Sequence, residues 1–136
     1  MAESVIVYGW TGSEYARVPM LWGYGGQYAE HEQDLNTGPA DETLTFSTVP
    51  AGEVWVITLF TGFCDTANPE VVSLRAVIGG TTHYLAMVAD ITANLMVVMQ
   101  GEIILVEDDY LCAVFEGCGL NDKIYADAVG YKMSIT

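Results

Sequence analysis

Carboxylates are the side chains that this sequence offers most freely for chemistry, and several of them fall beside expected turns. Asp65, Glu70, Asp122 and residues 107–109 could in principle bind calcium, because Ca²⁺ takes carboxylate and carbonyl oxygens from loops. The D-x-D-x-D-G spacing of a calcium loop is not present, so acids in solvated turns are the better interpretation. A glycosidase needs two carboxylates in one cleft, and nothing in the sequence singles out such a pair. We therefore predict no catalytic residue and no metal site.

Histidines and cysteines supply no second kind of chemistry. His31 and His83 have no histidine or cysteine at ligand spacing, which argues against structural zinc. We expect His31 in an exposed polar turn and His83 in a strand. Cys64, Cys112 and Cys118 are odd in number, which does not suggest a disulfide framework. They are read as thiols, and the chain is predicted to have no cofactor and no enzymatic activity.

The elements that would position any functional residue are mostly strands. Residues 41–136 are predicted to form an antiparallel β-sandwich of jelly-roll-like type, because short apolar runs alternate with turn residues at sandwich spacing. Gly79-Gly80 is the clearest hairpin signal. Gln100-Gly101 and Gly130 are also predicted to separate strands. Residues 29–35 are expected to form a helical turn or a polar loop.

The predicted strand over residues 53–60 is apolar on both faces, and residues 95–99 and 103–106 share this pattern. Along residues 53–60, one face carries Val54, Val56 and Phe60, and the other carries Trp55, Ile57 and Leu59. A sandwich has one core, so the outward face needs a cover, either the N-terminal segment or a second copy of the protein. The pattern does not say which face points inward. The residues expected to be largely buried are Trp55, Ile57, Leu74, Leu105, Leu111, Phe115 and Ile135.

Residues 1–40 differ from the rest in being rich in glycine and large aromatic rings. We predict that this irregular segment is an arm that packs partly on the sandwich and partly on a neighbouring chain, since exposed aromatic surface on this scale is a liability. The alternative is that the same residues form ordinary strands of one sandwich. The proposed arm contacts are the six aromatic residues Tyr8, Trp10, Tyr15, Trp22, Tyr24 and Tyr28.

The balance of charge excludes two classes of partner. The chain has 18 acidic and four basic residues, a formal net charge of −14. Nucleic acids and anionic membranes are recognised through Lys and Arg, so neither is expected to bind. No apolar run approaches the ~20 residues of a membrane span. The first residues lack the basic character of a secretory signal, so we expect a protein that is not exported.

Three motifs resemble a known group of proteins. Residues 49–55 read V-P-A-G-E-V-W, residues 108–113 read D-D-Y-L-C-A after the G-E-I-I-L of residues 101–105, and residues 129–131 read V-G-Y. Together they resemble small β-sandwich structural proteins of tailed bacteriophages, of the capsid decoration type, over residues 49–133. Asp108 stands where that group usually has glycine.

The resemblance implies a role and a location. It implies a virion structural protein that decorates or cements a capsid by binding the lattice of the major capsid protein. It also implies self-association, as a homotrimer first and a dimer second, and a place in the virion after assembly in the host cytoplasm. The alternative is a carbohydrate- or receptor-binding module of a phage tail or head fibre.

Overall fold

The computed structural model describes residues 8–10, 15–17 and 21–135, and the side chains of residues 25–134. Within these ranges the chain is entirely β-strand, turn and loop, and includes no helix of the length and apolarity that a membrane span requires. The strands are β1 (Tyr8–Trp10), β2 (Tyr15–Arg17), β3 (Leu21–Asp34), β4 (Glu42–Thr45), β5 (Glu53–Cys64), β6 (Val71–Ile78), β7 (Thr81–Ala89), β8 (Val97–Leu105), β9 (Tyr110–Glu116) and β10 (Ile124–Ile135).

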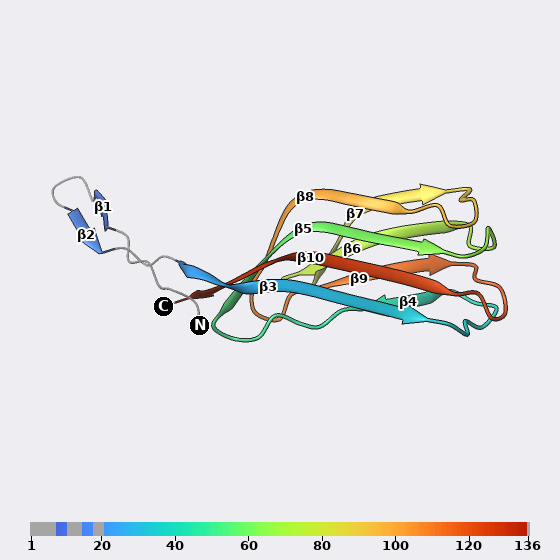
Figure 1. Ribbon diagram of the computed structural model, residues 1–136, viewed down its shortest axis with the longest axis horizontal. Coiled ribbons are helices and arrows are strands. Elements are labelled where there is room, and N and C mark those ends of the chain that lie inside the picture. The colour runs from blue at the N-terminus through green and yellow to red at the C-terminus, as the bar shows by residue number, and fades with distance from the viewer. Residues whose placement is uncertain (1–7, 11–14, 18–20, 136) are drawn as a thin grey trace.

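Eight of these strands form two four-stranded antiparallel sheets packed face to face (Figure 1). The first sheet has the order β3-β10-β5-β8 and the second has the order β4-β9-β6-β7. The chain is folded in half about the β6–β7 turn, so that β5 pairs with β8, β4 with β9, and β3 with β10. This nested pairing over two sheets is the jelly roll, and it confirms the predicted fold. The small sheet of β1 and β2 lies apart from the sandwich, at the end where β3 begins (Figure 1).

The turn predicted at Gly79-Gly80 is confirmed. Both residues have positive φ, 59° and 80°, as a type I′ hairpin turn requires. The chain also turns at residues 50–53, with Gly52 at φ 81° and Glu53 N–H donating to the Pro50 carbonyl.

Two other glycines were predicted as turns, and both predictions are wrong. Gly101 lies within β8, where the pairing with β5 shifts between Ile57 and Leu59. Gly130 lies within β10, where the pairing with β5 shifts again. Gly101, at φ 148°, lies in a β-bulge where glycine supplies backbone freedom, whereas Gly130 lies opposite the extra residue Thr58 of β5, where the absence of a Cβ atom lets the two backbones come close. In both places a glycine within an apolar run gives the same sequence signal as a turn, although the strand continues through it.

The helical turn or polar loop predicted at residues 29–35 is also wrong, because β3 extends to Asp34 as an edge strand beside β10. Exposure alternates along this part of the strand: Ala29, His31 and Gln33 are exposed, whereas Tyr28 is buried. A strand at the edge of a sheet can carry many polar side chains, because one of its two edges faces solvent and pairs with no other strand. Residues 21–34 of the expected 1–40 segment thus belong to the sandwich, and the division of the chain after residue 40 stays a prediction.

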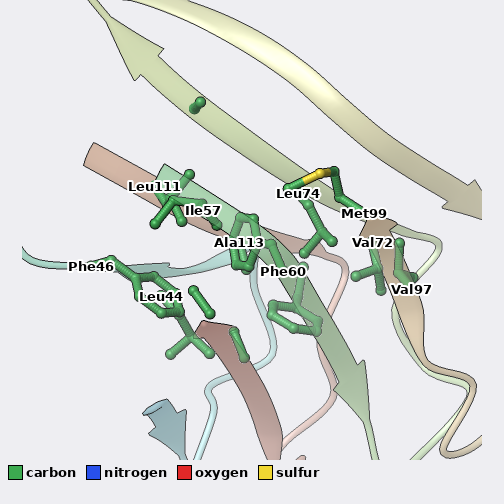
Figure 2. Packing of buried hydrophobic residues seen from close by; sticks show 14 of the residues in the cluster. Leu44, Phe46, Ile57, Phe60, Val72, Leu74, Val97, Met99, Leu111 and Ala113 are labelled. Carbon is green, nitrogen blue, oxygen red and sulfur yellow. The ribbon is translucent and has the colours of Figure 1, made fainter. Parts of the chain in front are cut away.

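The core fills the space between the sheets (Figure 2). In β5, Trp55, Ile57 and Phe60 all face inward, because the bulge at Thr58 changes the alternation of the strand. The grouping of Phe60 with Val54 and Val56 was therefore wrong. Burial is confirmed for Trp55, Ile57, Leu74, Leu105, Leu111 and Phe115, while the side chain of Ile135 lies outside the described residues.

Candidate functional site

The six aromatic residues proposed as arm contacts lie in three different strands. Tyr8 and Trp10 are in β1, Tyr15 is in β2, and Trp22 and Tyr24 are in the first part of β3. The side chains of these five lie outside the described residues, so their contacts stay a prediction.

Tyr28 has a role within its own chain. It is buried, and its ring centroid lies 4.6 Å from that of Trp55. Its hydroxyl donates to Oε1 of Glu30 at 3.1 Å. Burial, reinforced by the Glu30 charge, raises the pKa of Tyr28. The ring therefore packs the sandwich and is not open to a neighbouring chain.

The outer side of the first sheet is a mostly apolar surface, which we call the first outer face. On this side, strand β5 carries Val54, Val56 and Thr61, which are buried, and Leu59 and Phe63, which are half-buried, and it is flanked by β8 and β10. Ile104, Val98 and Val129 are its most exposed large apolar side chains, at 59%, 47% and 39%. This is the second apolar face expected from the sequence of residues 53–60, and exposed apolar surface of this kind marks a contact site.

A polar group borders this face on β3 and β10. Nδ1 of His31 lies 2.7 Å from Oδ1 of Asp127, and Nε2 lies 2.9 Å from Oε1 of Gln33. Both ring nitrogens can donate only when the imidazole is protonated. The hydrogen bonds to Gln33 and Asp127 accordingly raise the pKa of His31. His31 was correctly predicted to be exposed, but it lies in a strand rather than a turn.

Beside this group, Phe63 and Tyr125 form a stacked aromatic pair with centroids 4.9 Å apart. Both side chains are half-buried and belong to the first outer face. An apolar ring surface next to hydrogen-bonding side chains suits a ligand that has both apolar and polar sides.

The outer side of the second sheet, the second outer face, has a different composition. It includes Arg75, whose guanidinium carbon lies 4.4 Å from the ring centroid of Tyr84. Nε of Arg75 donates to Oγ of Ser73 at 2.9 Å. Tyr84 and Met87 on β7 are largely exposed. The members of this face are Thr43, Thr45, Val71, Ser73, Arg75, Val77, Thr82, Tyr84, Met87, Ala89, Tyr110, Cys112, Val114 and Glu116.

Two of the turn acids are structural rather than solvated. Asp109 is 3% exposed and accepts hydrogen bonds from the Gly79 and Val106 N–H groups, both at 3.0 Å. Asp122 is also buried, and it accepts from Gly119 N–H and from Nδ2 of Asn68. The expectation of solvated acids is wrong at these two positions, because each carboxylate serves as acceptor for otherwise unpaired loop donors.

Cys64, Asp65 and Asp122 are the described group that comes nearest to a metal site, with one ligand atom of each within 4.8 Å of the others. However, Asp65 already accepts from Lys123 N–H, and Asp122 is occupied as described above. Burial raises the pKa of the Cys64 thiol, and it raises that of the nearby Cys118 to about 12. A metal binds the thiolate form of cysteine, which a raised pKa disfavours. We therefore interpret these three residues as stabilising the loops around them through hydrogen bonds and packing.

Comparison with known proteins places the fold. No protein-family model matches the chain, and no curated protein matches it in sequence. A chain of the acidic stable capsid of Helicobacter pylori bacteriophage KHP30 superposes with a TM-score of 0.58 and 10% identity, over 88% of this chain and 97% of that one. A chain of the cyanophage Pam1 capsid gives a TM-score of 0.47 and 15% identity, over 81% and 87%. At these identities, the similarity to the KHP30 chain establishes a shared jelly-roll-like fold.

Proposed function

We propose that this protein is a structural component of a virus particle, and that it decorates or cements a capsid by binding the lattice of the major capsid protein. In this role it acts by binding and not by catalysis, and it is located in the virion after assembly in the host cytoplasm. The observation that carries the proposal is an exposed apolar face on a jelly roll whose fold is shared with a phage capsid chain.

The first outer face is the surface proposed to meet the lattice. Ile104 and Val98 are exposed there on β8 and Val129 on β10, and β5 is hydrogen-bonded between these two strands. The free energy gained is about 25 cal/mol per Å² of apolar area buried. The face therefore supports stable binding only if the surface of the partner is complementary in shape and covers most of it. The resemblance of residues 49–133 to capsid decoration proteins names the major capsid protein as that partner.

The N-terminal strands are proposed to add a second contact. β1 and β2 form a sheet of their own, apart from the sandwich (Figure 1). In the proposal, the arm expected from residues 1–40 makes its contacts through the five aromatic residues that precede Tyr28. The neighbouring chain that the arm contacts is another copy of this protein, in the trimer or the dimer that the resemblance implies.

Binding to particles that lack the chain tests the proposal. Ile104→Glu places a charge at the most exposed apolar side chain of the first outer face, on its edge strand β8, and is expected to lower the copy number per particle at least about tenfold. Leu120→Glu is the matched control, because Leu120 is 71% exposed in the loop before β10, and it is expected to bind normally. Copy number is measured by quantitative mass spectrometry of purified particles. Undiminished binding of Ile104→Glu, or no binding of the unaltered chain, would reject the proposal.

A carbohydrate- or receptor-binding module is the second candidate. The stacked Phe63 and Tyr125 rings beside His31, Gln33 and Asp127 support it, because sugars are bound by aromatic rings with flanking polar groups. A glycan array distinguishes the candidates. A specific signal that Tyr125→Ala abolishes would favour this second role, whereas the capsid proposal expects none.

A further inference from the structure

The second outer face is nearly free of charge, although the protein carries 18 acids. Its members include one acid, Glu116 on β9, and one base, Arg75 on β6. The other members are small, apolar or aromatic, with Tyr84 and Met87 the most exposed. Depletion of charge together with Tyr, Met and Arg is the composition of a protein–protein contact.

Arg75 is held in place but pairs with no acid in the described part of the chain. Ser73 and the Tyr84 ring fix the guanidinium. Among the residues that the structure describes, the one ion pair is that of His31 with Asp127. An arginine ordered on a neutral surface is suited to a carboxylate brought by another molecule, because its planar fork needs no further ordering.

The positions of the two charges make this face complementary to itself. Arg75 lies opposite Cys112, Glu116 lies opposite Val71, and the Ser73–Val114 pair lies midway between them. At about 3.3 Å per residue, Arg75 and Glu116 are about 13 Å apart along the strands. Each lies two residues from the Ser73–Val114 pair, on opposite sides of it. If a second copy turns over about an axis across the strands at Ser73 and Val114, Arg75 comes over Val71 of the other copy, one strand spacing of about 4.8 Å from Glu116 and within reach of its carboxylate.

We propose that two copies of this chain pack face to face through the second outer face, about a two-fold axis at Ser73 and Val114, so that Arg75 of each copy binds Glu116 of the other. Met87 is the β7 partner of Ser73. In this arrangement it lies near the axis and meets Met87 of the other copy. An isologous contact of this kind closes with two copies.

The size of the face sets the expected strength. Strands β6, β7 and β9 have 8, 9 and 7 residues and β4 has 4. At about 3.3 Å along and about 4.8 Å across the strands they give about 450 Å² per copy, or about 900 Å² in total. That total is at the lower end for a specific interface, so we expect a dimer with a dissociation constant in the micromolar range. Of the trimer and the dimer implied by the resemblance, this face favours the dimer and leaves the first outer face free for a capsid.

Charge reversal tests the pairing in the full-length chain, with the dissociation constant measured by sedimentation equilibrium. Arg75→Glu alone and Glu116→Arg alone are each expected to weaken the dimer at least about tenfold. The double variant should restore it, because the same face then carries the inverted pattern. Lys123→Glu, an exposed loop position, is the control that makes the same change in net charge as Arg75→Glu.

Met87→Glu gives an independent variant, because this side chain is 62% exposed and its replacement places two like charges together at the axis. It should yield a folded monomer by circular dichroism and sedimentation. A monomeric unaltered chain at 100 µM, unchanged dimers in the single variants, or failure of the double variant to recover would each overturn the inference. None of these measurements involves a capsid, so they stand or fall separately from the proposed function.

Discussion

Gly130 gives the sharpest test of how the first sheet is built. It lies in β10, between β3 and β5, at the point where the pairing with β5 shifts. A Cβ atom at this position would overlap the carbonyl oxygen of Val56 and would lie 2.9 Å from Cα of Ile57. Replacement by alanine therefore forces two hydrogen-bonded strands apart.

The expected cost follows from which atoms collide. The overlapped atoms belong to the backbone of β5, so no change of side-chain rotamer can relieve them. Overpacking of a core costs about 1–3 kcal/mol, and a rigid backbone neighbour places this site at the upper end. Alanine also lowers the conformational entropy of the unfolded chain relative to glycine, which offsets about 0.4–1 kcal/mol of this cost. We expect a net loss of about 2–3 kcal/mol, a large part of the 5–15 kcal/mol typical of a domain.

Urea unfolding followed by circular dichroism measures this loss. With a slope of about 1–3 kcal/mol per M, the midpoint of Gly130→Ala should fall by about 1–2 M. Gly38→Ala is the matched control, because a Cβ there meets only Oε1 of Glu42 at an ordinary 3.7 Å. If the two variants unfold at the same midpoint, the close approach of β10 and β5 at Gly130 is wrong.

The remaining predictions concern a buried carboxylate and an exposed histidine. Asp109→Ala leaves the Gly79 and Val106 N–H groups without their acceptor and should cost about 3 kcal/mol in urea unfolding, whereas Asp109→Asn keeps one acceptor oxygen and should cost less. Equal losses in both variants would contradict this. The pKa of His31 is raised in the folded state, so its contribution to stability is full below about pH 6.5 and is lost as pH rises through the folded pKa. The stability advantage of the unaltered chain over His31→Asn should therefore shrink between pH 5.5 and 8.5; an advantage that grows with pH would refute the assigned pairing.

Strand content and the central hairpin could be predicted from the sequence because their signals are local. Gly79-Gly80 has no other use between two apolar runs, so the hairpin followed directly. Gly101 and Gly130 carry the same local signal, but the bulge at Gly101 and the close backbone approach at Gly130 exist only because β5 passes beside them. The bulge at Thr58 likewise decides which face of β5 is inside, and no pattern within β5 reveals it.

The candidate surfaces were harder to predict because they depend on which strands become neighbours. Glu116 and Arg75 are far apart in the sequence and meet on one face only through the pairing of β6 with β9. Asp109 could not be distinguished from Asp108 and Glu107 until the β6–β7 turn was placed beside it. The last part of β3 could not be recognised as a strand because residues 30–34 are polar on both faces, and only the pairing with β10 makes it one.

The nested pairing of the jelly roll also fixes the order in which the chain can fold. β6 and β7 are joined by two residues, whereas Asp34 of β3 must find Ile124 of β10. The entropy of closing a loop grows with its length, so the inner pairs form at lower cost and β3 docks last. Folds dominated by such distant pairings fold slowly, in about milliseconds to seconds. Until β3 arrives, Trp55 lacks the Tyr28 ring and β10 presents an open edge. The nearly complete sandwich is therefore the state in which a newly made chain is most exposed to aggregation.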